Sequence, residues 1–133
     1  MTKELEKFQG TWKQLTYEKD GIKEHADEHG WEPSVTFTGN TFVVTLADGS
    51  VPIKGTFTVD PTRSPKTIEY TDTFGADAGK TFPGIYILEA DLLVFCVGDP
   101  GEKRPTAFRT RRGQVMRIIR REKPGVCTSA WPL

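Results

Sequence analysis

The chain has 133 residues, 18 basic and 18 acidic side chains, no net formal charge, and 36% hydrophobic residues. This length suits one domain, and the charge balance argues against a general nucleic-acid or membrane-surface role, which needs a basic excess. The first residues form no apolar targeting segment, and no apolar run approaches the ~20 residues of a membrane helix. We therefore expect a cytoplasmic protein, unless a leader precedes this sequence.

The N-terminal residues predict a short helical turn. Thr2 is a suitable N-cap for a turn over Lys3–Phe8. Within that turn Leu5 and Phe8 are three residues apart and share one face. We expect these two apolar side chains to close one end of a barrel.

The remainder of the chain is typical of short strands joined by tight turns. The tripeptide Gly10-Thr11-Trp12 opens the first predicted strand, Thr11–Glu18, which a polar loop over Lys19–Pro33 follows. The other predicted strands are Ser34–Thr38, Thr41–Leu46, Val51–Val59, Lys66–Asp72, Gly84–Glu89, Leu92–Val97, Pro105–Thr110 and Gln114–Glu122. Gly55 in the middle of a strand predicts a bend or bulge.

Nine strands at this spacing, with no helix long enough for a parallel crossover, indicate an all-β fold. Most connections are short, which favours a single antiparallel up-and-down β-barrel of eight or nine strands behind the helical turn. Closing the sheet on itself would remove its exposed edges.

The opening Phe8-Gln9-Gly10-Thr11-Trp12-Lys13 resembles that of the lipocalins, in which a short helical turn precedes Gly-x-Trp. In that group a basic side chain near the end of the last strand packs over the Trp ring. The resemblance implies that Arg121, or failing that Arg120 or Arg117, covers Trp12. Gly10, Trp12 and Arg121 would then form the base of the barrel, and Trp12 would be largely buried.

The chain is also similar to a family of small lipocalin-like domains from bacteria of the planctomycete type. The matching segments are Gln9-Gly10-Thr11-Trp12, Gly55-Thr56-Phe57-Thr58-Val59-Asp60-Pro61, Lys66-Thr67-Ile68, Gly84-Ile85-Tyr86-Ile87-Leu88 and Arg104-Pro105-Thr106-Ala107-Phe108. The resemblance implies one barrel domain over residues 1–123 and a C-terminal tail over 124–133. That family brings no established catalytic residues.

Candidate ligand contacts follow from the strand pattern. We expect an aromatic lining from Phe57, Tyr70, Tyr86, Phe95 and Phe108. Hydrogen bonds to a ligand would come from Tyr70, Tyr86, Thr106 and Arg117. Trp31, in the long first loop at the open end, would contact the ligand as part of a lid. The alternative is that the same rings simply fill a small barrel.

The segment Glu24–His29 contains His-x-x-Glu-His, the order found in inverted zinc peptidases. Its place in a polar loop and the lack of a third ligand predict no tight metal site, and no cofactor is expected. Cys96 and Cys127 are expected to be reduced thiols, although a bridge between them would be favoured in an exported protein.

The leading functional hypothesis is a monomeric lipocalin-like protein that binds a small apolar or amphipathic molecule, with an anionic ligand as one option. One alternative is a cofactor-free enzyme of isomerase or cyclase type, with Glu69 or Tyr86 as the first acid–base candidates. Another is an interaction module with a solid barrel. A buried carboxylate facing the interior would favour the enzyme. Neither nucleic acid nor membrane is expected as a partner.

Overall fold

The computed structural model describes residues 2–25 and 33–122. These residues form one helical turn, α1 (Lys3–Glu6), and nine strands. The strands are β1 (Gly10–Lys19), β2 (Ile22–His25), β3 (Ser34–Thr38), β4 (Thr41–Thr45), β5 (Ile53–Asp60), β6 (Lys66–Phe74), β7 (Thr81–Glu89), β8 (Leu92–Gly98) and β9 (Gln114–Arg121). Within the described residues, no helix is long and apolar enough to cross a membrane.

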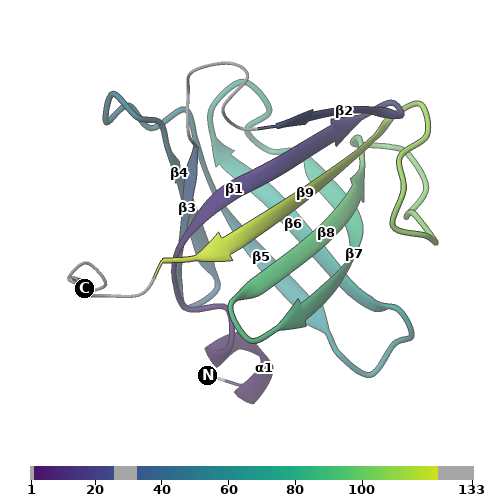
Figure 1. The fold of residues 1–133 in the computed structure, drawn as a ribbon, viewed down its shortest axis with the longest axis horizontal. Coiled ribbons are helices and arrows are strands. Elements are labelled where there is room, and N and C mark those ends of the chain that lie inside the picture. Colours follow the sequence, from purple (N-terminus) through teal and green to yellow (C-terminus); the bar gives the residue numbers. More distant parts are fainter. Residues whose placement is uncertain (1, 26–32, 123–133) are drawn as a thin grey trace.

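Eight of the strands form a closed antiparallel barrel, which confirms the predicted fold class (Figure 1). Each strand from β3 to β9 pairs with the next, and β9 pairs with β1 to close the sheet. The other edge of β1 is shared, since Gly10–Lys13 pair with β3 and Thr16–Lys19 pair with β2. β2 therefore lies outside the closed ring, as a hairpin arm at the end of the barrel opposite α1.

The predicted strand at Pro105–Thr110 is wrong, and this segment is an irregular loop. The reason is that β8 pairs directly with β9, from Leu92 with Arg120 to Gly98 with Gln114, so no strand fits between them. The loop instead contacts the outer side of the barrel, where the Thr110 hydroxyl lies 2.6 Å from the Glu18 carboxylate and accepts the Gly21 N–H at 2.7 Å.

β2 lies in the segment for which the sequence analysis predicted only a polar loop. Asp20 and Gly21 both have positive φ, at 52° and 87°, and form a two-residue connection between β1 and β2. Asp-Gly is a strong signal for such a hairpin. The alternation around it is weak, because Lys23 and Glu24 interrupt the apolar pattern after Ile22.

The predicted helical turn is confirmed, and it lies across one end of the barrel (Figure 1). The Thr2 hydroxyl accepts the Leu5 N–H at 3.2 Å, as an N-cap does. Phe8 is fully buried in the core, and Leu5 packs against that core. This end is called the base below, and the end that carries β2 is called the upper end.

The bulge predicted at Gly55 is also present, because the register between β5 and β6 shifts between Lys54 and Gly55. A Cβ atom on Gly55 would overlap the Phe42 ring and the Thr71 carbonyl oxygen. Glycine is required here because the two neighbouring strands approach the backbone too closely for any side chain.

Candidate functional site

The base of the barrel is held by Arg121 and Trp12. Trp12 is fully buried, and the Arg121 guanidinium carbon lies 4.4 Å from the centre of its ring. The indole N–H donates to the Phe8 carbonyl oxygen at 2.8 Å. Arg121 also bonds the Asp91 carboxylate and backbone carbonyls of the N-terminal turn. The arrangement expected for Gly10, Trp12 and Arg121 is therefore present, with Arg121 in preference to Arg120 or Arg117.

A second polar contact joins α1 to the wall of the base. Glu4 is only 8% exposed, and its Oε2 accepts the Tyr86 hydroxyl at 2.5 Å and the Lys66 ammonium at 3.3 Å. Burial raises the pKa of Glu4, but the bonds from Tyr86 and Lys66 outweigh it and leave that pKa below its usual value. Burial and the bond to Glu4 raise the pKa of Tyr86. Tyr86 thus has a structural partner at the closed end.

Aromatic rings fill the interior near the base. Phe8 packs against Phe37, Phe57 and Tyr86 with ring centres 5.6, 5.4 and 5.3 Å apart. Phe57 and Tyr86 are 2% and 1% exposed, respectively. These two predicted ligand contacts are therefore part of the packed aromatic core at the base. For them the alternative holds, in which the rings simply fill the barrel.

Toward the upper end, several inward-facing side chains are only half buried. They are Tyr17, Val44, Ile53, Tyr70 and Phe82, and all of them pack against the core. The Tyr70 ring stacks on Phe82 with centres 4.7 Å apart and meets Phe42 edge-on at 5.5 Å. An apolar surface that solvent reaches is therefore present around the upper end.

Four polar side chains share this region: Tyr17, Tyr70, Asp72 and Arg117, which we call the upper polar cluster. Arg117 lies over the Tyr17 ring at 4.9 Å. Removal from water raises the pKa of Tyr70 to about 12, although the positive charge of Arg117 opposes the shift. The cluster combines a cation, two phenols and a carboxyl group beside aromatic rings.

Asp72 is the most unusual member of the cluster. It is 4% exposed, and its Oδ1 has no hydrogen-bond partner among the described residues. Burial, and then the negative charge of Asp77, raise the pKa of Asp72 to about 6, while Arg117 lowers it. A group that titrates near neutrality can exchange protons with a ligand or with water.

The structure brings together only some of the ligand-contact residues predicted from the sequence. Tyr70 and Arg117 belong to the upper polar cluster, and Phe95 lies beside Arg117 across the β8–β9 pairing. The placement of Thr106 and Phe108 in an inward-facing strand is wrong, because both lie on the outer loop and neither belongs to the core. Trp31 lies outside the described residues.

Sequence reasoning missed Tyr17 and Asp72. The signal for Asp72 was the alternation on β6, because Ile68 and Tyr70 face the interior and Asp72 continues the same face. Glu69 faces the opposite way, as period-two alternation requires, and pairs with Arg104 on the outer wall. Thus the two acid–base candidates predicted from the sequence, Glu69 and Tyr86, both have structural partners. Asp72 is the carboxyl group of β6 that faces the interior.

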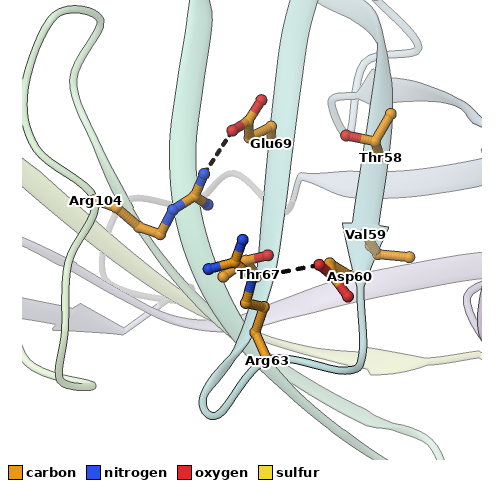
Figure 2. A pocket seen from close by; sticks show the side chains of 7 residues that line it. All are labelled: Thr58, Val59, Asp60, Arg63, Thr67, Glu69 and Arg104. Atoms are coloured by element: carbon orange, nitrogen blue, oxygen red, sulfur yellow. Dashed lines mark hydrogen bonds and ion pairs between the residues drawn. The ribbon is translucent and has the colours of Figure 1, made fainter.

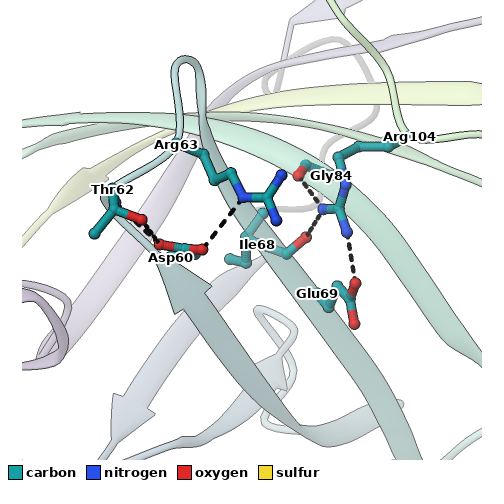
Figure 3. Close-up of polar contacts among 7 residues, drawn as sticks. All are labelled: Asp60, Thr62, Arg63, Ile68, Glu69, Gly84 and Arg104. Atoms are coloured by element: carbon teal, nitrogen blue, oxygen red, sulfur yellow. Dashed lines mark hydrogen bonds and ion pairs between the residues drawn. The ribbon is translucent and has the colours of Figure 1, made fainter.

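A hollow of about 330 Å³ lies on the outer wall, lined mainly by β5 and β6 (Figure 2). Its two guanidinium groups each face a carboxylate, Arg63 with Asp60 and Arg104 with Glu69. Arg104 Nη1 also donates to the Ile68 and Gly84 carbonyl oxygens at 3.0 and 2.7 Å (Figure 3). These bonds tie the loop between β8 and β9 to the barrel wall.

Two side chains on the outer face of the barrel, Ile85 and Cys96, are buried although they lie outside the core cluster. The Cys96 thiol lies 3.6 Å from the Arg109 carbonyl oxygen, and burial raises its pKa to about 11. Cys96 is a free thiol, while Cys127 lies outside the described residues, so the proposed bridge stays a hypothesis.

Among residues 2–25 and 33–122, no group of three or more potential metal ligands is present. His25 ends β2, and His29 falls outside those ranges.

A scan of protein-family models and searches of curated proteins and of solved structures gave no match to this chain.

Proposed function

We propose that the barrel binds a small amphipathic molecule at its upper end. The observation that carries this proposal is the set of half-buried, inward-facing side chains there, with Tyr70 among them, together with Arg117 on the inward face of β9. Small-molecule sites typically combine aromatic walls with a few convergent polar groups. The packed base would hold the barrel rigid without taking part in binding.

The chemistry of the cluster favours an anionic headgroup. Arg117 carries a permanent positive charge and presents several N–H donors in one plane. No ion pair recorded among the described residues includes Arg117. The apolar part of the ligand would lie against Phe82 and the Tyr70 ring. The likeness of the Trp12 base to that of lipocalins supports the same proposal, that the chain is a lipocalin-like binding domain.

Two fluorescent dyes with the same ring system test this. N-phenyl-1-naphthylamine is neutral, and 1-anilinonaphthalene-8-sulfonate adds one sulfonate. Both should bind at one site per chain near about pH 5.5, with the sulfonate dye bound more tightly because Arg117 pairs with it. Arg117→Met should lower the affinity for the sulfonate dye by about tenfold or more and change the affinity for the neutral dye by less than about twofold.

A pair of adjacent substitutions locates the site. Val44 faces the interior and Val43 faces outward on β4. Val44→Trp should fill the upper end and abolish binding of both dyes, whereas Val43→Trp should not. If Val44→Trp binds the dyes as well as the parent, the ligand site is not the barrel interior. Val44 replaces Tyr86 as the position for this test, because Tyr86 belongs to the packed base.

Asp72 favours a second function, a cofactor-free enzyme that moves a proton on carbon. A buried carboxyl group that titrates near 6 can act as a general base at neutral pH, and Arg117 could stabilise a developing enolate. Deuterium exchange at the acidic C–H of 2-tetralone in D₂O, followed by NMR, tests this. Exchange no faster with the parent than with Asp72→Asn would exclude it.

A further inference from the structure

Asp72 lies on the interior face of β6, the face that also carries Ile68 and Tyr70. Its carboxyl group is 4% exposed, and Oδ1 has no partner among the described residues. Its backbone is held by the β6–β7 turn, since its N–H donates to the Lys80 carbonyl oxygen and its own carbonyl oxygen accepts the Gly79 N–H. The side chain is thus held on the interior face with hydrogen-bonding capacity unused.

Arg117 lies on the interior face of β9, between the core residues Val115 and Ile119, and its positive charge acts on both Asp72 and Tyr70. An ionised Asp72 opposes the positive field of Arg117 and repels an incoming anion. A protonated Asp72 does neither, and it adds an O–H donor to the N–H donors of Arg117. The two protonation states therefore offer different sites to an anion.

We propose that Asp72 gates the anion site at Arg117: the barrel takes up an anionic headgroup when Asp72 is protonated and releases it when Asp72 ionises. The headgroup class is an anion that only accepts hydrogen bonds, such as a carboxylate or sulfonate. This inference rests on the proposed function, and binding of the anion is coupled to uptake of one proton from water by Asp72.

The charged groups around Asp72 agree with a transition in the weakly acidic range. On its own strand Tyr70 stays neutral there, because its pKa is raised to about 12. From the β6–β7 turn Asp77 adds negative charge, partly offset by Lys80 at 3.3 Å from it. From β9 comes Arg117, while the β5 neighbour opposite Asp72 is the uncharged Gly55. Burial is the largest influence on the pKa of Asp72, which lies at about 6.

The test measures the affinities of the two dyes from about pH 5 to about pH 8. Both histidines should first be replaced by Gln, because free His titrates in the same range. The sulfonate stays ionised throughout, so its affinity should fall by about tenfold to a hundredfold over this range, following the protonated fraction of Asp72. The neutral dye should change by less than about twofold, since it brings no charge.

Two variants test whether Asp72 is the group responsible for the pH dependence of the dye affinity. Asp72→Asn should bind the sulfonate dye tightly and equally across the pH range, because the amide stays neutral. Asp77→Asn is the matched control and should retain the pH dependence, moved to lower pH. In the parent, saturation with the sulfonate dye should raise the pKa of Asp72, measured by ¹³C NMR of its carboxyl carbon, because the coupling is reciprocal.

The outcomes distinguish this inference from the proposed function. If neither dye binds the parent, the proposed function is wrong. If the sulfonate dye binds with no pH dependence, binding stands and the gate is wrong. If Asp72→Asn keeps the full pH dependence, or if the dye leaves the Asp72 pKa unchanged, another group is responsible and the assignment to Asp72 is overturned.

Discussion

Arg121 lies over the indole of Trp12 at 4.4 Å and joins the last barrel strand to the first. The same guanidinium donates to the Lys7 and Ala90 carbonyl oxygens at 2.9 and 3.1 Å. One side chain therefore seals the junction between β1, β9, the N-terminal turn and the β7–β8 turn. Lysine could not replace it, because an ammonium group lacks the planar fork that reaches all these acceptors.

Arg121→Met should lower the free energy of unfolding by about 2–4 kcal/mol, through lost hydrogen bonds to charge and a lost cation–π contact. Urea denaturation of the purified variant measures this. Arg120→Met is the matched control, because Arg120 is exposed and the change should stay within about 0.5 kcal/mol. Equal effects of the two substitutions would contradict the structural role of Arg121.

Glu4 should make stability depend on acid pH. Its folded-state pKa is lowered from the usual 4.5 by Tyr86 and Lys66, despite the opposing effect of burial. The stabilisation is therefore present above about 4.5 and is lost as pH falls through the folded-state pKa. Glu4→Gln should cost about 1–3 kcal/mol at neutral pH and progressively less as pH falls through the folded-state pKa of Glu4. Glu6→Gln, on the exposed side of α1, is the control and should change the free energy of unfolding at neutral pH by no more than about 0.5 kcal/mol.

Asp72 should make stability depend on pH in the opposite direction from Glu4. Its pKa is raised from 3.8 to about 6 in the folded state, so folding favours the protonated form. Stability should fall as pH rises from about 4 to about 6 and then level off. Asp72→Asn should consequently be more stable than the parent at about pH 8, on the order of 2–3 kcal/mol, and equal to it near pH 3.5. Denaturation of both proteins at the two pH values decides this, and a less stable Asn variant at pH 8 would refute it.

Arg104 should control the accessibility of Cys96. Its bonds to the Ile68 and Gly84 carbonyls and to Glu69 hold the loop that contacts the thiol. In a Cys127→Ser background, Arg104→Ala should increase the rate of labelling of Cys96 by a disulfide reagent by about tenfold or more, because local opening becomes easier. Arg63→Ala, on the same outer hollow, is the control and should leave the rate unchanged. Equal rates in parent and Arg104→Ala would show that the loop is held by other contacts.

Local sequence patterns were enough to predict the all-β class, and the resemblance to lipocalins predicted the contacts at the base. Period-two alternation is a local property, so most strands could be read directly, including β3 and β4 across the Gly39-Asn40 turn. Gly-x-Trp near one end of the chain and Arg121 near the other predicted their contact, through the resemblance to lipocalins. The helical turn followed from a cap and two apolar residues, which are again local signals.

Which of the polar groups have partners, and which segments join the sheet at all, depended on how the whole barrel packs. Pro105–Thr110 has the alternation of a strand, but closure pairs β8 with β9 and leaves it no edge to join. Tyr86 and Asp72 both point inward. Tyr86 donates a hydrogen bond to Glu4, whereas Oδ1 of Asp72 has no donor among the described residues. Burial and partnership depend on several strands at once, so no local pattern in the sequence can specify them.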